Sequence, residues 1–319
     1  MAKYIIRKVL QAVVVMLLVT FVSFMLIDIM PGDAAVIYLG TDASDPVLLA
    51  ETRAALNLDK PLPIQWFLWV KNALRGEFGN SFYYKIPVSE MIGDRIGITF
   101  SHGLVALIFS IIVGLFLGIL AATHRNRFWD NFINVLANIG ISAPSFWMSI
   151  LFIYLFAMAL KILPVQGYVD PKVDFKDSLV HMIGPCFIMS LSSIATITRQ
   201  TRASVLDVLN EDYVRTARSK GLKGRVILLK HVLKNALIPV LTVLGISIAS
   251  LFGGSVMIEQ IFNIPGMGQL VNAAVMNRDI PIIQAYIVII SFVIIISSLL
   301  VDIAYGIVDP RIRTTGGEQ

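Results

Sequence analysis

Cysteine, histidine and charge are all scarce in this chain of 319 residues. The single cysteine, Cys186, excludes a disulfide within the chain, and the four histidines lack the spacing of metal ligands. There is also no G-x-x-x-x-G-K-[ST] phosphate loop, no serine nucleophile elbow and no motif of paired carboxylates. We therefore expect no catalytic residue, no metal site and no bound cofactor, and we expect that the chain is not an enzyme.

Charged residues make up only 15% of the chain, whereas hydrophobic residues make up 56%, with a mean hydropathy of +0.78. Such a composition leaves too little polar surface to enclose a soluble core. A helical span of a bilayer needs about 20 apolar residues. Six segments meet this need: 9–30, 97–122, 132–160, 178–202, 237–258 and 281–308. We predict an all-α polytopic membrane protein with six transmembrane helices.

Two of these spans have a distinct character. The first follows Lys3, Arg7 and Lys8 and so resembles a secretory signal, but its apolar run is too long and no small-residue cleavage site follows it. We predict that it is a retained helix. The fourth contains Ser, Thr and Pro, which lower its hydropathy, so we expect it inside the bundle rather than against lipid.

Basic residues set the expected orientation. With the N-terminus in the cytoplasm, the inner segments hold 16 of the 26 basic residues and the outer segments hold 10. Six of those ten lie in the long segment 31–96, where the positive-inside rule is weak. We therefore place both termini in the cytoplasm. The net charge of +5 reflects this asymmetry, so we expect no nucleic-acid partner.

This topology divides the chain into four parts. Residues 1–30 form the N-terminal segment and first helix, and residues 31–96 form an extracytoplasmic cap. Residues 97–308 form a five-helix core with a cytoplasmic loop at 203–236, and residues 309–319 form a cytoplasmic tail. The cap carries 8 acidic and 6 basic residues and the aromatic stretches WFLWV and SFYYK, so we expect a folded unit rather than a linker.

Four ionisable residues lie near the ends of the predicted spans: Asp28, Asp302, Arg199 and Arg202. A charge within a membrane is a candidate for function. Because each of the four is close to an interface, we expect it to be solvated or paired. A proton pump built on a buried carboxylate therefore has little support.

Small residues recur at every fourth position in two spans, which lets helix backbones approach closely in lipid. They are Ala106, Ser110, Gly114, Gly118 and Ala122 in the second span, and Gly245, Ala249 and Gly253 in the fifth. In the third span, Gly140 and Pro144 should bend or break the helix. Such a break is tolerated only within protein or beside water, so it is either a simple kink or part of a pathway wall.

A long basic segment, EDYVRTARSKGLKGRVILLKHVLKN at 211–235, separates the fourth and fifth spans. Asn210 is a suitable N-cap, Glu211 and Asp212 place negative charge in a first turn, and Gly221 suits a left-handed end. These signals predict a short helix of about ten residues.

A second short helix is expected to begin near Lys223 or Gly224 and to carry its apolar side chains on one side. These side chains are Val226, Ile227, Leu229, Val232 and Leu233. The two helices form a hairpin on the cytoplasmic face. Its apolar face, with Tyr213, Val214 and Ala217, is predicted to rest on the membrane surface beside anionic lipid or to serve a partner protein.

A series of motifs resembles one group of transporters. EDYVRTARSKGL is followed by LLKHVLKNALIPV, GGSVMIEQIFNIPGMGQL, NRDIPIIQA and VDIAYGIVDPRIR, and the N-terminal YIIRKVLQAVVV and MPGDAA are similar to that group as well. The chain resembles B-type permease subunits of the peptide/nickel/glutathione group of ABC importers over nearly its whole length. The resemblance implies the type I ABC importer permease fold, in a bacterial or archaeal plasma (inner) membrane.

In that group the cytoplasmic loop is the EAA loop, whose short coupling helix docks in a groove of an ATPase subunit. By position, the EAA pattern falls on Arg215, Thr216 and Ala217, with its glycine at Gly221. Arg and Thr stand where the general pattern has Glu and Ala, which looks typical of the peptide branch, so a Glu-specific contact is not implied. The implied coupling residues are Asn210, Glu211, Asp212, Tyr213, Arg215, Thr216, Ala217 and Gly221, with the small Ala217 against the partner.

The resemblance also implies a set of partners. These are a second, C-type permease, two cytoplasmic ATPases that bind ATP and Mg, an extracytoplasmic solute-binding protein, and membrane lipid. The cap is then expected to form part of the docking floor for the binding protein. Dipeptide, oligopeptide, glutathione and nickel-chelate substrates all remain open, with peptides first.

The expected pathway is lined by the broken third span and by the polar face of the fifth span. The candidate residues are Ser142, Pro144, Ser145, Ser247, Ser250 and Ser255. Serines at helix breaks hydrate a conduit without imposing a charge preference, as a transporter of zwitterionic peptides needs. A secondary transporter would instead need a midplane ion site or an inverted repeat, and a membrane-embedded enzyme would need a clustered catalytic set. The sequence shows none of these.

Overall fold

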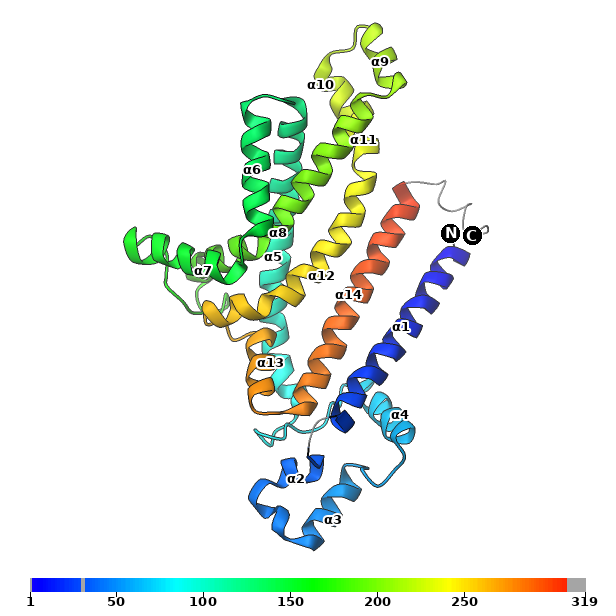
Figure 1. Cartoon of the computed structure of the whole chain (residues 1–319), viewed down its shortest axis with the longest axis vertical. Coiled ribbons are helices and arrows are strands. Elements are labelled where there is room, and N and C mark those ends of the chain that lie inside the picture. The colour runs from blue at the N-terminus through cyan, green and yellow to red at the C-terminus, as the bar shows by residue number, and fades with distance from the viewer. Residues whose placement is uncertain (1, 30–31, 309–319) are drawn as a thin grey trace.

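Long helices run side by side through the middle of the molecule, and smaller helical units lie at its two ends (Figure 1). The computed structural model describes residues 2–29 and 32–308. This described part consists of helices and loops and contains no β-strand. The predicted tail at 309–319 lies outside the described residues. The all-α class predicted from the sequence is confirmed.

Five helices are long and apolar enough to cross a membrane. They are α1 (Ala2–Ile29), α5 (Val88–Thr123), α8 (Phe175–Leu209), α12 (Ile238–Ile261) and α14 (Ile280–Val308). A sixth crossing exists only if the helices Phe128–Ser142 and Ser145–Ala159, which meet at 109°, count as one broken span. The helices overlap the six predicted segments when the broken pair is matched to the third, and the largest difference is at the start of α5.

That difference is large, because α5 begins at Val88 rather than at 97 and has 36 residues. At 1.5 Å per residue it is about 54 Å long, whereas the apolar core of a bilayer is about 30 Å thick. The additional turns carry Glu90, Asp94 and Arg95, so they extend beyond the apolar layer. Hydropathy missed these turns because the charged residues lie outside any apolar window.

The central helix is α8, as the prediction of an inner fourth span requires. Half of its apolar window is buried, whereas 28% is buried in α5 and α12 and 6% in α1 and α14. Its main neighbour is α5, whose small residues Ala106, Ser110, Gly114, Gly118 and Ala122 are all buried. A Cβ atom on Gly114 would lie 2.8 Å from Ile197 Cβ, and one on Gly118 would lie 2.5 Å from Thr201 Cβ. The predicted close packing of this stripe is confirmed.

The second stripe packs only in part within this chain. A Cβ atom on Gly245 of α12 would lie 3.5 Å from Val301 of α14, but no atom lies within 4 Å of the corresponding position on Gly253. The packing prediction therefore holds at one end of this stripe and not at the other.

A short helix, α13 (Met267–Met276), lies between the fifth and sixth predicted spans. Its N-terminus is held by Glu259 of α12, which is buried. The carboxylate accepts hydrogen bonds from Thr99 Oγ1 of α5 at 2.7 Å and from the N–H groups of Gly268 and Gln269 at 2.7 and 3.1 Å. Because a first helical turn has N–H groups without helical partners, this one carboxylate joins α5, α12 and α13.

The predicted cap is a set of small helices: α2 (Ala34–Leu39), a 3-10 turn at Gly40–Ser44, α3 (Pro46–Ala55) and α4 (Leu62–Ala73). Asp33 begins it by capping α2 and by pairing with Arg53 of α3. Partial burial raises the pKa of Asp33, but the hydrogen bonds from Arg53 and from the Ala35 N–H outweigh this effect and hold the pKa below its ordinary value. The segment that we expect to be a folded unit thus contains four short helices in the structure.

Two sets of contacts attach the cap to the membrane helices. The rings of Trp66 and Trp69 on α4 lie against Phe21 and Phe24 of α1, with centroids 5.6 and 6.1 Å apart. This contact explains the WFLWV stretch as a helix packed along α1.

The second contact is made by Asp279, whose side chain is fully buried at the turn between α13 and α14. It accepts hydrogen bonds from Ser81 Oγ at 2.5 Å and from the N–H groups of Phe82 and Tyr83 at 3.0 and 3.2 Å. The stretch SFYYK is thus fixed to the start of the last membrane helix.

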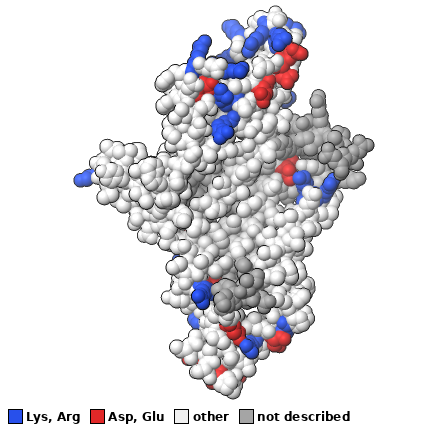
Figure 2. Space-filling view, in the orientation of Figure 1, with Lys and Arg blue, Asp and Glu red and all other residues white. Residues whose placement is uncertain are grey.

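Charged side chains gather at the two ends of the molecule and in small groups at its two flanks, and the rest of the visible face is mostly uncharged (Figure 2). Large apolar side chains are exposed on the long helices, among them Leu10, Ile112 and Leu300, which are 61%, 63% and 62% exposed. Exposed apolar side chains along several long helices suit contact with lipid rather than with water.

The α5–α8 contact generates a stability prediction. Gly118→Ala should destabilise the purified protein by about 1–3 kcal/mol, because its methyl group overlaps Thr201 and the backbone oxygen of Thr198. Gly97→Ala is the matched control, since Gly97 lies on the same helix with no neighbouring atom within 4 Å. Thermal unfolding in detergent measures both, and equal midpoints for the two variants would contradict the close packing.

Candidate functional site

The charged segment between α8 and α12 forms a helical hairpin at the end of the molecule opposite the cap (Figure 1). It comprises α9 (Asp212–Ser219), α10 (Gly224–Ile227), a π-helical turn at Leu228–Val232 and α11 (Leu233–Ala236). The predicted start of its second helix near Lys223 or Gly224 is confirmed.

The beginning of α9 differs from the prediction. Asn210 is not its N-cap. It has helical dihedral angles and its N–H bonds to Asp207 O at 3.1 Å, so it is the C-cap of α8. The N-cap position is taken by Glu211, whose side chain makes no capping hydrogen bond. The other end agrees with the prediction, since Gly221 has a φ of +75°. Its N–H bonds to Arg218 O at 2.9 Å.

One face of α9 is buried against the chain itself. Val214 is fully buried and Ala217 is 6% exposed. They pack in a cluster with Ala122 of α5, Val205 of α8, and Ile227, Val232 and Ala236 of the second half of the hairpin. The prediction that Ala217 contacts a partner is therefore wrong: its small size lets α9 sit close to the ends of α5 and α8. The same packing overturns the alternative that Val214 and Ala217 rest on lipid.

The opposite face of α9 carries the charges and is open. The side chains of Asp212 and Arg215 are 96% and 78% exposed, and they lie 3.6 Å apart as an i,i+3 pair. Thr216 is exposed beside them. Tyr213 lies between the two faces and accepts a hydrogen bond from Asn235 Nδ2 at 2.8 Å, which fastens α9 to α11. The hairpin thus packs one face of α9 against the chain and leaves the charged face exposed.

The second half of the hairpin departs from the predicted helical spacing. Ile227 and Val232 are buried and Val226 and Leu233 are partly buried, but Leu229 is 56% exposed. The reason is the π-helical turn at Leu228–Val232, in which residues five apart share a face. The prediction for Leu229 assumed the α-helical spacing and is wrong.

The third span is broken where the sequence predicts it. α6 (Phe128–Ser142) ends before Ala143 and Pro144, which are extended with ψ of 129° and 132°. α7 (Ser145–Phe152) then begins, followed by a π-helical segment at Ile153–Ala159. Pro144 lacks an N–H and cannot continue α6. A Cβ atom on Gly140 would lie 3.2 Å from Leu191 O, so the end of α6 packs closely on α8.

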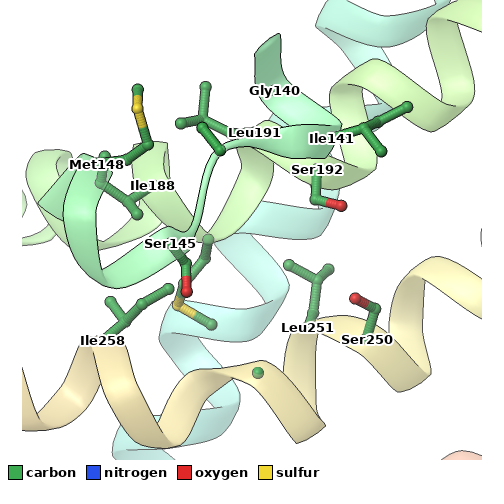
Figure 3. A pocket seen from close by; sticks show the side chains of 13 residues that line it. Gly140, Ile141, Ser145, Met148, Ile188, Leu191, Ser192, Ser250, Leu251 and Ile258 are labelled. Atoms are coloured by element: carbon green, nitrogen blue, oxygen red, sulfur yellow. The ribbon is translucent and has the colours of Figure 1, made fainter. Parts of the chain in front are cut away.

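A cavity of about 240 Å³ lies beside this break. In Figure 3 the labelled side chains from α6, α7, α8 and α12 surround one space, with the hydroxyl groups of Ser145, Ser192 and Ser250 among them. The lining comprises Gly140, Ile141, Ala143, Ser145, Met148, Ile188, Met189, Leu191, Ser192, Ser250, Leu251, Gly254 and Ile258. No charged residue is among them.

The structure brings together only part of the predicted pathway set. Ser145 and Ser250 line the cavity. Ser247 and Ser255 are buried between helices, and Ser255 Oγ donates to Phe252 O at 3.1 Å, so they do not line it. Ser142 and Pro144 are exposed outside the lining.

The predicted pathway set missed most of the lining, including Ser192, Met189 and Met148. A signal for Ser192 was present, because the serine content of the fourth span already placed that helix inside the bundle. The methionines carried no such signal, since a methionine in an apolar run is indistinguishable from an ordinary packing residue.

Two of the four ionisable residues near the ends of the spans, Arg202 and Asp302, form ion pairs. Arg202 of α8 forms a two-point ion pair with Asp130 of α6, at 2.5 and 2.8 Å. Asp302 pairs with Lys8 at 2.9 Å, and Arg199 is exposed. The side chain of Asp28 lies outside the described residues. Among the residues that the structure describes, no group of three or more His, Cys, Asp or Glu side chains could hold a metal ion.

Comparisons with known proteins agree with this architecture. The model of the binding-protein-dependent transport system inner membrane component family matches residues 114–314, and the model of the N-terminal part of such components matches residues 1–103. A protein of Sinorhizobium fredii described as a peptide ABC transporter permease is 41% identical over 313 residues, which cover 98% of this chain and 100% of that protein. The oligopeptide transport system permease protein AppB of Bacillus subtilis is 37% identical over 320 residues, with 98% and 100% covered.

Among solved structures, the MetNI methionine ABC transporter in an inward-facing conformation matches with a TM-score of 0.57. The match covers 69% of this chain and 96% of that chain at 16% identity, so it bears on the fold alone. The resemblance inferred from the sequence motifs is confirmed by the family models and relatives. The chain belongs to the family of binding-protein-dependent transport system inner membrane components and is an integral membrane permease subunit of the ABC importer type.

Proposed function

We propose that this chain forms one part of a transmembrane pathway for dipeptides and oligopeptides. Partner ATPase subunits that hydrolyse ATP bind α9, and their movement is transmitted to the pathway through this helix. The observation that carries the proposal is the construction of the hairpin. One face of α9 is locked by Val214 and Ala217, and the other presents exposed Asp212 and Arg215 to a partner. Because α9 is packed against the rest of the chain, a displacement of α9 is passed on to the helices that it contacts. A helix that contacts only lipid would move without displacing them.

The proposed arrangement in the membrane places the hairpin and both termini in the cytoplasm and the cap outside, with six crossings when the broken span is counted. The separation of the hairpin and the cap to opposite ends of the molecule supports this arrangement (Figure 1). So does the excess of Lys and Arg in the segments assigned to the cytoplasm, which hold 16 of 26.

The proposed partners are a second, C-type permease, two ATPases that bind ATP and Mg, and a solute-binding protein that docks on the cap. The low burial of α1 and α14 and the open end of the α12 stripe leave apolar helix surface for a second permease and for lipid. The cap supports a docking role because it is folded and anchored, through Asp279, to the turn before α14.

A peptide substrate is supported by the relatives that are described as peptide permeases and by the chemistry of the cavity. Its serine hydroxyls and the extended backbone at Ala143 offer hydrogen bonds, whereas its methionine and aliphatic side chains accept varied side chains. An uncharged lining suits a zwitterion because it favours neither terminus. Uptake of glutathione or of a nickel chelate in place of peptides would overturn this assignment.

Exchanging the charges of α9 tests the coupling role. The double variant Asp212→Arg/Arg215→Asp keeps the net charge of the hairpin, so binding to anionic lipid should persist, but it reverses the pattern that a protein groove would meet. We expect less co-purified ATPase and reduced peptide uptake. Lys220→Glu and Lys223→Glu are the comparison variants, since they change the net charge most. If these two abolish uptake while the exchange has no effect, the hairpin serves lipid instead.

The turn at Gly221 gives a second test of the same role. Gly221→Val should cost about 1 kcal/mol or more through its positive φ. Because nothing lies within 4 Å of the added Cβ, the effect is on the backbone alone. Gly221→Asn is the matched control, since Asn tolerates the left-handed region. We expect uptake to fall in the Val variant and to be largely kept in the Asn variant; equal uptake by both would show that the turn is not needed.

Cysteine labelling tests the pathway. In a Cys186→Ser background, Ser145→Cys and Ser250→Cys should react with a small water-soluble thiol reagent, at rates that change when the ATPases are trapped. Ser247→Cys should be protected, because Ser247 is buried and outside the cavity lining. Equal protection of all three positions in every state would remove the cavity from the pathway.

A further inference from the structure

The ion pair between Asp130 and Arg202 is the most fully satisfied charged group near the hairpin. The Asp130 side chain is 2% exposed and that of Arg202 is 26% exposed. Besides the two bonds from Arg202, the carboxylate accepts hydrogen bonds from the Asn126 N–H at 2.9 Å and from Asn134 Nδ2 at 2.8 Å. A two-point bond between a guanidinium and a carboxylate fixes orientation as well as distance.

This pair joins the two elements that the proposed function needs to connect. Arg202 lies on α8, seven residues before its end at Leu209, so it is about 10 Å along the helix from the start of the hairpin. Asp130 lies in the first turn of α6, about 18 Å along that helix from Ser142 at the break. Asn126 belongs to the turn after α5, which the carboxylate also holds.

A second contact fixes the other end of α6. Gly140 approaches the backbone oxygen of Leu191 on α8 so closely that a Cβ atom would lie 3.2 Å from it. Two separated contacts between the same helices prevent α6 from pivoting on α8 about either one. The glycine contact is van der Waals packing without a hydrogen bond and allows sliding, whereas the ion pair permits one register only.

The value of the pair lies in position more than in stability. Desolvation offsets much of the attraction in a buried ion pair, so such pairs often add little to the free energy of folding. Losing one partner, in contrast, leaves a buried charge without compensation. A single register of α6 against α8 is therefore what the pair provides.

We propose that Asp130 and Arg202 are positioning residues that transmit the movement of α9 to the broken span and its cavity. The proposal rests on the coupling role proposed for the hairpin. When α9 is displaced, the end of α8 moves with it, because Val214 and Ala217 pack against Val205. Arg202 then carries α6 along, and the break at Ser142–Ser145 changes the cavity.

The test uses the assembled transporter with its ATPases, carrying Ser145→Cys in the Cys186→Ser background as the reporter. The measured quantity is the ratio of thiol-labelling rates with the ATPases trapped by vanadate and with nucleotide absent. Arg202→Lys keeps the charge but loses the two-point geometry. Asp130→Asn/Arg202→Gln removes both charges, so no unpaired buried charge disturbs folding. We expect both variants to retain co-purified ATPase and ATP hydrolysis, while the two labelling rates become equal.

Arg199→Gln is the matched control, because Arg199 is exposed and lies one turn away on the same helix. It should keep the parental ratio. If the doubly neutral variant also keeps the parental ratio, or if Arg199→Gln loses it, the proposed link is overturned. If the parental transporter shows no nucleotide-dependent labelling at position 145, the coupling role proposed for α9 is overturned. The role proposed for Asp130 and Arg202 is then overturned as well. A variant that loses its ATPases would also contradict the proposal, which requires assembly to be unaffected.

Discussion

The close approach of α5 and α8 is the contact on which the rest of the structure depends. In lipid, apolar side chains gain little by moving from acyl chains to another helix, so association relies on tight van der Waals packing and on few, well-placed hydrogen bonds. Gly114 and Gly118 provide that packing because the side chains of Ile197 and Thr201 occupy the space that a Cβ atom would need. With α8 fixed in this way, its one end carries the hairpin and its middle forms a wall of the cavity.

Polar groups then fix the relations between helices that apolar packing leaves free. Glu259, Asp279 and Asp130 are each buried, and each accepts several hydrogen bonds, at least one of them from an element distant in the sequence. Burial of a carboxylate is costly unless it is fully partnered. These three sites therefore specify position: Glu259 and Asp279 at the two ends of α13, and Asp130 at the turn between α5 and α6.

Sequence reasoning found the spans, the inner position of α8, the break at Pro144 and the positive φ of Gly221. Each of these follows from a local property, such as hydropathy over 20 residues, a missing N–H or a missing side chain. It missed the direction of Ala217, because an alanine fits equally well against a partner and against its own chain. It also missed the π-helical turn that exposes Leu229, and it missed Asp130 as the partner of Arg202 from 72 residues away. These depend on register and tertiary contact, which no local pattern encodes.

The anchor at Asp279 has a consequence for the end of the molecule that carries the cap. One carboxylate receives three donors from the stretch Ser81–Tyr83, and all three are lost or made together when that side chain moves. The polar attachment of the aromatic stretch to the turn before α14 therefore depends on one side chain, so a single change at Asp279 would remove all three hydrogen bonds together.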